Sequence, residues 1–309
     1  MLSRIAESLY WLGRYTERAE DTARILDVHY HLLLEDRWVD EHSACEALLD
    51  VMGIGDRATP GCDSSSVTRL LAYDTENSGS IAGALANAWT NARGAREAIS
   101  SEMWECLNTT NGALAGRVRI ASAQSPHSFF DWVKERSAIL AGFAESTMSR
   151  DDGWRFLLLG RSLERADMTA RLLSARYGES WGQAGWVTTL RCCSAYEAYL
   201  RTYQRAVDAS LAAEFLVLDR LFPRSLFHAL STAEQCLAEL DPVYGRTGVD
   251  DAARRHLGLA RTQLEFRSAD ELLADLPEHL FRIQQQCFDA GAAVAARYFR
   301  ATRLVEWSA

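Results

Sequence analysis

A repeated cluster of acidic and basic side chains is the feature of this sequence best suited to chemistry. Residues 12–26 read LGRYTERAEDTARIL and residues 159–173 read LGRSLERADMTARLL, with ten of fifteen aligned positions identical at an offset of 147. Arginine binds carboxylate and phosphate groups through paired hydrogen bonds, and a glutamate can transfer protons or orient such arginines. The two segments are therefore the first candidates for a binding or catalytic site.

The spacing of these charges sorts them into two adjacent stripes of one helix. In the first copy one stripe holds Glu17 and Arg24, and the neighbouring stripe holds Arg18 and Asp21. Met168 stands in the second copy where Asp21 stands in the first. The two copies are thus chemically unequal, and we expect a single active centre to draw more on the first.

Two glutamates are the catalytic candidates, although catalysis itself is left open: Glu17 and Glu164. The substrate-binding candidates are the charged residues of both copies: Arg14, Glu17, Arg18, Asp21, Arg24, Arg161, Glu164, Arg165 and Arg171. The alternative is a polar clasp in which these charges satisfy one another, because an unpaired buried charge costs several kcal/mol. Glycine at the same place in both copies, Gly13 and Gly160, indicates close approach of two helices. We expect the copies to meet face to face and to line one central cleft.

Two further pairs of similar segments extend the repeat along the chain. Residues 69–85 match 214–230 at an offset of 145, and residues 125–143 align more weakly with 276–294. Three pairs of similar segments that follow in the same order in both halves predict a tandem duplication, whose period is too long for a solenoid. The expected halves are 1–150 and 151–309, packed as one globular unit about a pseudo-twofold axis.

Apolar residues recur at spacings of three and four, and strand-like alternation does not occur, so the predicted fold class is all-α, a multi-helix bundle. Long helices are predicted over 3–35, 79–113, 126–148, 151–177, 184–206, 223–240, 248–267 and 269–301. Shorter helices are predicted over 40–52, 66–73 and 210–220, and loops over 53–65, 178–183 and 241–248.

Two other polar segments supply secondary candidates: Arg93, Arg96, Glu97, Glu102, Asp219 and Arg224. The first four lie in 91–108, where the bland interpretation is a solvated, salt-bridged face. The last two lie in 218–226 at an expected helix start, where an anion could bind. The alternative there is a plain helix cap.

The composition excludes several classes of function. The chain of 309 residues has a formal net charge of −9, which disfavours nucleic acid and anionic membranes as partners. No apolar run has the length of a signal-peptide core or a membrane span, so we expect a cytoplasmic protein. Seven cysteines without a CxxC pair predict buried thiols.

Metal and nucleotide sites are not expected in this chain. Asp27, His31 and Glu35 have a spacing that could place three ligands on one helix face. The Glu-x-x-His pair of di-iron bundles is absent, however, and we predict no metal. Glycine-rich phosphate loops are also absent from the sequence, so ATP is not expected to bind to this chain alone.

Four segments together resemble a bacterial family, the alpha-E domain proteins: SLYWLGRYTERAEDTARIL (8–26), LLLGRSLERADMTARLL (157–173), NARGAREAISSEMWECLN (91–108) and LDRLFPRSL (218–226). The resemblance implies an all-helical fold whose Glu–Arg motif falls on Glu17–Arg18 and Glu164–Arg165. Members of the family are typically encoded beside, and sometimes fused to, a circularly permuted ATP-grasp protein, often with a transglutaminase-like protein nearby. That context implies ATP-dependent amide or peptide ligation, with ATP and magnesium entering only through the partner ligase.

The expected function is therefore that of an accessory or partner protein of an ATP-grasp ligase, binding substrate or ligase through the Glu–Arg cleft. One alternative is a stand-alone helical enzyme that acts on a small anionic substrate. Another is a non-catalytic scaffold whose Glu–Arg clusters are internally paired. Whether the chain is an enzyme, and whether it forms a homo-oligomer, is left open.

Overall fold

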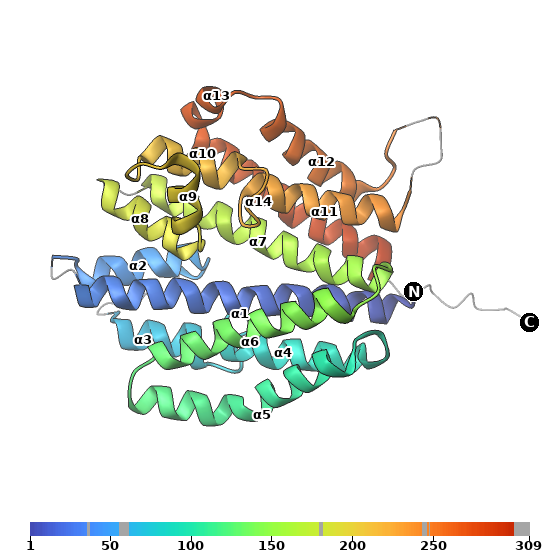
Figure 1. Cartoon of the computed structure of the whole chain (residues 1–309), viewed down its shortest axis with the longest axis horizontal. Helices are drawn as coiled ribbons and strands as arrows, with labels where there is room; N and C mark the ends of the chain where they lie inside the picture. Colours follow the sequence, from blue (N-terminus) through green and yellow to red (C-terminus); the bar gives the residue numbers. More distant parts are fainter. Residues whose placement is uncertain (36–37, 56–61, 179–181, 243–245, 247, 300–309) are drawn as a thin grey trace, which may run out of the picture.

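Two long helices, α1 (Ser3–Glu35) and α7 (Asp152–Gly178), run through the middle of the computed structural model (Figure 1). The structure describes residues 1–35, 38–55, 62–178, 182–242, 246 and 248–299, with the backbone alone for 176–178 and 182–184. The predicted loops at 53–65, 178–183 and 241–248 lie partly outside these residues. No strand occurs in the described ranges, and the all-α prediction is confirmed.

The other elements form two groups around the central pair. Before α7 they are α2 (Glu41–Val51), α3 (Ser64–Thr68), the π-helical turn η2 (Arg69–Tyr73), α4 (Ile81–Gly94), the short 3₁₀ turn η3 (Arg96–Ala98), α5 (Ser101–Ala123) and α6 (His127–Thr147). After α7 they are α8 (Gly182–Cys192), α9 (Tyr196–Tyr203), α10 (Ala209–Leu218), α11 (Leu226–Leu240), α12 (Ala252–Glu265), α13 (Ala269–Ala274), α14 (Leu276–Val294) and η4 (Ala295–Phe299).

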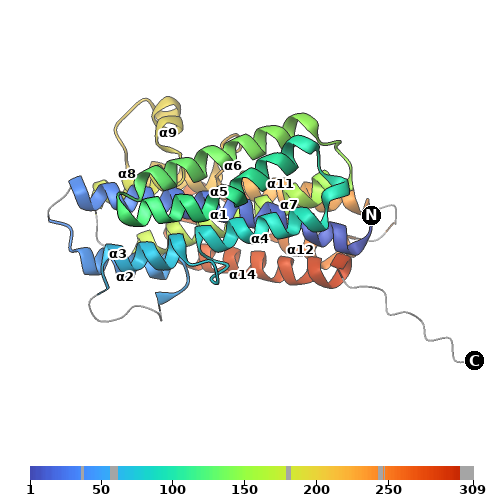
Figure 2. The ribbon, with the colours of Figure 1, turned by 90° about the horizontal axis from the view of Figure 1, so that it is seen from below.

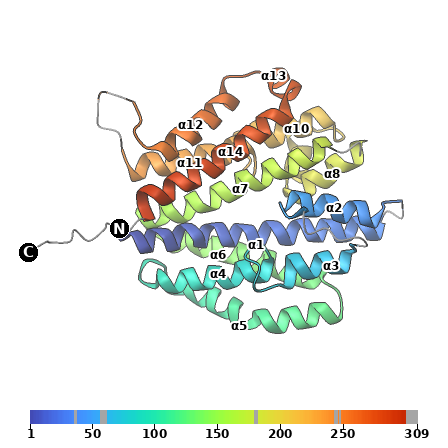
Figure 3. The ribbon, with the colours of Figure 1, turned by 180° about the vertical axis from the view of Figure 1, so that it is seen from behind.

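The two groups use the same packing scheme. Helix α1 packs against α4 and α6, and α5 packs against both of these. In the same way α7 packs against α11 and α14, and α12 packs against both of these. Figures 1 and 3 show α4 and α5 on one side of the α1–α7 pair and α11 and α12 on the other. The boundary expected at residue 150 falls in the turn between α6 and α7. Duplication itself stays a prediction.

The short helices α2 and α8 cross between the groups. Helix α2 packs against α7, and α8 packs against α1, so each covers the central helix of the other group. Seen from below, α2 and α14 lie along one edge of the molecule and α6 lies along the other (Figure 2). The edge with α2 and α14 is the one that carries the cavity described below.

Three of the predicted long helices are each interrupted in the structure. The helix predicted over 79–113 breaks before α5, where the Ser100 hydroxyl accepts a hydrogen bond from Met103 N at 3.2 Å and caps a new helix. The helix predicted over 184–206 breaks at Ser194, whose φ of 51° is left-handed. The helix predicted over 269–301 breaks at Asp275, because Pro277 begins a new first turn.

The core is apolar and continuous around the central helices. Leu9 and Leu12 of α1 and Leu159 and Leu163 of α7 have no exposed surface. All seven cysteines are free and buried, which confirms the prediction of buried thiols. None of the described helices is long and apolar enough to cross a membrane.

Candidate functional site

The crossing of α1 and α7 depends on one glycine from each helix. A β-carbon at Gly13 would lie 2.1 Å from the carbonyl oxygen of Leu157, and one at Gly160 would lie 2.0 Å from that of Tyr10. Any side chain at either position would collide with the opposite backbone. The two glycines therefore let the backbones touch, as the repeated glycine in the sequence predicts, and this contact brings the two Glu–Arg motifs together.

The motif glutamates exchange arginines across the crossing. Arg14 Nε and Arg18 Nε of α1 each donate to Glu164 of α7 at 2.6 Å. Reciprocally, Arg161 Nε and Arg165 Nε of α7 donate to Glu17 of α1 at 3.0 and 2.7 Å. Glu17 and Glu164 are 1% and 3% exposed, so these charge-assisted bonds lie inside the protein. Both copies of the motif thus contribute to both clusters.

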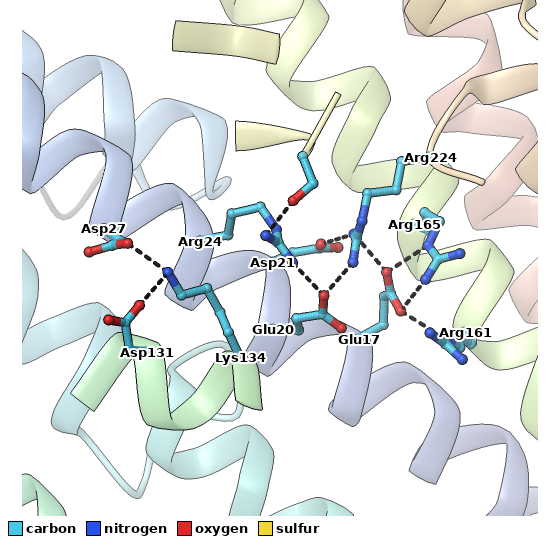
Figure 4. Close-up of polar contacts among 11 residues, drawn as sticks. Glu17, Glu20, Asp21, Arg24, Asp27, Asp131, Lys134, Arg161, Arg165 and Arg224 are labelled. Atoms are coloured by element: carbon cyan, nitrogen blue, oxygen red, sulfur yellow. Dashed lines mark hydrogen bonds and ion pairs between the residues drawn. The ribbon is translucent and has the colours of Figure 1, made fainter. Parts of the chain in front are cut away.

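The cluster around Glu17 is closed. Its members, here called the Glu17 cluster, are Glu17, Glu20, Asp21, Arg24, Arg161, Arg165 and Arg224 (Figure 4). Arg224, from the turn before α11, reaches Glu17 at 2.8 Å and Glu20 at 2.7 Å and also binds Asp21. Beside this cluster the packing leaves only about 30 Å³. That volume holds no more than a water molecule or two.

Within the Glu17 cluster the pKa of Glu17 is lowered and the pKa of Asp21 is raised. Burial alone would raise the pKa of Glu17, but Arg165, Arg224 and Arg161 outweigh it and hold that pKa well below the usual range. Burial raises the pKa of Asp21 to about 7, and the attraction of Arg224 does not offset it. Asp21 Oδ2 is buried without a hydrogen-bond partner in the described part of the chain. Such an oxygen readily carries a proton.

The cluster around Glu164 opens instead into a cavity of about 770 Å³, here called the Glu164 cavity. Its wall combines α1, α7, α14 and the turn before α4, with Glu164 and Asp167 among the α7 residues. The charged groups that line it are Arg14, Arg18, Glu164, Asp167 and Arg171. Apolar and amide side chains complete the wall: Trp11, Met168, Phe281, Gln284 and Phe288.

The pKa values of the two acids of the cavity shift in opposite directions. Burial would raise the pKa of Glu164, but Arg14 and Arg18 reverse this and lower it, so Glu164 is ionised. Burial raises the pKa of Asp167, and its partner Arg171, with Nε at 2.9 Å, only partly compensates. Asp167 is thus the acid of this cavity that most lacks a cationic neighbour.

The placement of the candidates differs from the single central cleft expected from the sequence. Only one of the two Glu–Arg sets faces open space, because Arg224 fills the corresponding place in the other. The candidates that line the Glu164 cavity are Arg14, Arg18, Glu164 and Arg171. Those in the Glu17 cluster are Glu17, Asp21, Arg24, Arg161 and Arg165.

Comparison with known proteins agrees with this fold and motif. The chain matches the Alpha-E family, described as a predicted alpha-helical domain with a conserved ER motif, over residues 1–299. The chain belongs to the Alpha-E family. In this Alpha-E chain each of the Glu–Arg pairs Glu17–Arg18 and Glu164–Arg165 consists of an acid at the crossing and an arginine that binds the opposite acid.

Similar curated proteins come from mycobacteria. Uncharacterized protein Mb2597 of Mycobacterium bovis and Uncharacterized protein Rv2567 of Mycobacterium tuberculosis are each 26% identical to the Alpha-E chain over 334 residues. The match covers 95% of this chain and 36% of each relative, so the chain spans about a third of their length. No solved structure matches the chain.

The secondary candidates lie apart from the Glu164 cavity of the Alpha-E chain. Arg93 stacks on Trp89 at 4.9 Å, Arg96 stacks on Trp104 at 5.5 Å, and both arginines are exposed. Glu97 and Glu102 are also exposed. Asp219 caps a turn by accepting hydrogen bonds from two backbone amides. Ser225 caps α11.

A third polar cluster gathers around Asp27 on α1. Asp27, His31 and His127 offer ligand atoms within 4.8 Å of one another, whereas Glu35 is exposed at the end of α1. Lys134, the sole lysine of the sequence, places its Nζ 2.7 Å from both Asp27 and Asp131 (Figure 4). The ammonium group therefore supplies the positive charge that a metal ion would bring, and the absence of a metal stays a prediction.

Sequence reasoning missed the distinct role of Arg224 and the contribution of α14. Arg224 is only a secondary candidate for an anion site at a helix start in the sequence, yet in the structure it is 9% exposed and binds carboxylates. The offset of 145 that pairs Ser80 with Ser225 also pairs Gly79 with Arg224, and this difference is the signal that separates the closed cluster from the open cavity. The α14 residues carry no such signal, because apolar and amide side chains look alike in a core and in a cavity wall.

Proposed function

We propose that this Alpha-E chain is an accessory component of an ATP-grasp amide ligase and binds a small substrate of that ligase in the Glu164 cavity. The observation that carries the proposal is the cavity itself. Its volume of about 770 Å³ lies in the range of roughly 300–1,000 Å³ that small-molecule sites occupy. Three arginines and two acids line it, which suits a charged substrate held by directional bonds.

Partnership with a ligase rests first on the family resemblance and its gene context. The curated relatives are about three times as long as the matched region, so in them the region similar to this chain is one part of a longer protein. In this chain Phe281 and Phe288, which are 64% and 73% exposed, flank the cavity. Exposed aromatic side chains beside a binding site are typical of a surface that a partner covers. A transglutaminase-like protein is a second proposed partner.

The two alternative functions fit parts of the molecule less well. A general acid–base role for Glu164 is disfavoured, because Arg14 and Arg18 already bind the carboxylate and lower its pKa. A pure scaffold describes the Glu17 cluster, where guanidinium groups and acids pair with one another. It does not account for the charged wall of the Glu164 cavity.

Reconstitution tests the proposal. The full chain is combined with the ATP-grasp protein encoded beside it, ATP, magnesium and a panel of amino acids and dipeptides, and ATP-dependent products are measured by mass spectrometry. We expect the amide product to depend on the chain. Arg14→Gln, in the cavity, should lower its yield at least tenfold, because glutamine cannot form the charged paired contact.

Arg161→Gln is the matched control, because Arg161 makes the corresponding bond to Glu17 away from the cavity. This variant should keep most of the product yield at an equal folded fraction. Equal product with and without the chain would overturn the proposal. So would an Arg161→Gln variant that loses as much product as Arg14→Gln.

A further inference from the structure

The turn before α4 and the turn before α11 are built alike around one position that differs. Ser80 Oγ accepts a hydrogen bond from Gly83 N at 2.9 Å, and Ser225 Oγ accepts one from His228 N at 3.1 Å. Each serine also donates to an aspartate carbonyl six residues earlier. The residue before the serine is Gly79 in the first turn and Arg224 in the second.

The arginines of the motif confirm that these two turns occupy matching places. Arg18 Nη1 lies 3.5 Å from the carbonyl oxygen of Ser78, just before Gly79. Arg165 Nη1 lies 3.4 Å from the carbonyl oxygen of Pro223, just before Arg224. Gly79 therefore stands against Glu164 as Arg224 stands against Glu17, and Gly79 lines the Glu164 cavity.

The acids on the two sides receive different numbers of donors. Glu17 Oε1 accepts from Arg165 and from Arg224, whereas the described partner of Glu164 Oε1 is Arg18. Glu20 binds both Arg24 and Arg224. Its counterpart Asp167, which is one methylene shorter, binds Arg171 in the described contacts. One cationic donor is thus present on the closed side and has no counterpart on the cavity side.

We propose that the Glu164 cavity takes the side-chain guanidinium or ammonium group of a zwitterionic basic amino acid, held between Glu164 and Asp167 where the Arg224 guanidinium lies in the Glu17 cluster. The charge balance requires the second, anionic group of the ligand. On the closed side Asp21 binds Arg224, but Met168 stands in place of that acid beside the cavity. A bound cation would set four positive groups against Glu164 and Asp167, and a ligand carboxylate would supply the third carboxyl group that Asp21 supplies on the closed side.

This inference rests on the proposed function only in the use of the ligand: a molecule with an amine and a carboxylate is the class of substrate that amide ligation joins. The cavity and its acids argue for the binding by themselves. The test therefore uses the chain without any ligase, so failure of the ligase assay and failure of zwitterion binding are separate results.

Binding is measured by isothermal titration with three probes of nearly equal size: L-arginine, L-lysine and L-citrulline. Citrulline keeps the α-ammonium group, the carboxylate and the length of arginine but carries a neutral urea in place of the guanidinium, so it tests the side-chain cation alone. We expect arginine or lysine to bind at least tenfold more tightly than citrulline. Equal affinity for all three, or binding of none, contradicts the proposal.

A variant that fills the cavity from within gives an independent measurement. Gly79 has no left-handed φ, and a β-carbon there would meet only the Asn77 side chain, at 3.1 Å, so Gly79→Arg is sterically accessible. Together with Met168→Asp it reproduces the residues of the closed side. The double variant should raise Tm by about 2 °C and weaken arginine binding at least tenfold.

Gly248→Arg is the control, because Gly248 lies outside the helices, a side chain there meets open space and the change adds the same charge. It should leave both Tm and arginine binding unchanged. A Gly79→Arg/Met168→Asp variant that is less stable than the wild type, or that still binds arginine as well, would overturn the placement of the cation beside Glu164 and Asp167.

Discussion

Gly13 lies so close to the carbonyl oxygen of Leu157 that a β-carbon on Gly13 would sit 2.1 Å from it. The reciprocal contact of Gly160 with Tyr10 is equally short. Both contacts are between backbones, which cannot shift as a flexible side chain can. The ion pairs of the motif depend on this approach, since Arg14 and Glu164 bind across the same crossing.

Gly13→Ala should therefore destabilise the fold by about 3 kcal/mol, the upper part of the range for overpacked cores. Gly112→Ala is the control, because Gly112 lies in α5 with nothing within 4 Å of its added β-carbon. That substitution should stabilise by roughly 0.5–1 kcal/mol through helix propensity. Urea unfolding measures both. A Gly13→Ala protein as stable as Gly112→Ala would show that the helices separate easily.

Glu17→Gln should cost about 3 kcal/mol of unfolding free energy, because it leaves three guanidinium groups around a buried position short of a counter-charge. Glu164→Gln should cost about half as much, since two arginines lose a partner and water in the cavity can hydrate them. Chemical denaturation followed by circular dichroism compares the two. Glu145→Gln, at an exposed pair with Arg150, serves as the control with a change under about 0.5 kcal/mol.

Asp21 should impose an unusual pH dependence on stability. Burial raises the pKa of Asp21 to about 7 in the folded protein, whereas an unfolded aspartate titrates near pH 3.9. The folded state thus holds the proton more tightly, and this residue lowers stability as pH rises from about 4 to about 7. Asp21→Asn removes the titration, so its stability relative to the wild type should increase with pH across that window. A stability difference that is constant from pH 4 to pH 7 would rule out the raised pKa.

The two buried serine caps should contribute alike. Ser80 and Ser225 have no exposed surface, and each hydroxyl satisfies one backbone amide of the helix that it begins. Ser80→Ala and Ser225→Ala should each cost about 1 kcal/mol. Thermal unfolding measures the loss. The exposed Ser122, bonded only within its own helix, is the control. A strong loss at one cap and none at the other would show that the two turns are not equivalent in energy.

Much of the fold is predictable from this sequence because α1, α6 and α7 are continuous amphipathic segments with clear ends. The structure gives them bounds within about two residues of 3–35, 126–148 and 151–177. The predicted lengths of the three interrupted helices are too long, because the spacing of apolar residues alone does not show where a capping residue ends one helix and begins the next. Ser100 and Pro277 are both typical helix-start residues, and each lies where the chain begins a new helix.

The residues of the candidate site are predictable from the sequence, but their separation into a closed Glu17 cluster and an open Glu164 cavity is not. Repeated glutamates and arginines indicate pairing between the copies, yet the same pattern fits a closed cluster and an open one. The difference depends on Arg224, which comes from a separate turn and enters only through the folded geometry. Gly79 stands at the position that corresponds to Arg224, and Met168 at the one that corresponds to Asp21. These smaller or apolar residues leave the cavity open, and the spacing of apolar residues in the sequence does not indicate such a space.

Lys134 has a practical consequence for mapping partners. It is the only ε-amine in 309 residues, and it is paired with Asp27 and Asp131. Amine-reactive cross-linkers therefore find almost no reactive group on this chain, and a negative result with them does not show that a complex fails to form. Carboxyl-directed or photoactivated reagents suit it better, given its 42 acidic residues. Because the chain has one lysine, Lys134 is also a single defined position for a spectroscopic label, once Asp27 and Asp131, which pair with it, are replaced by neutral residues.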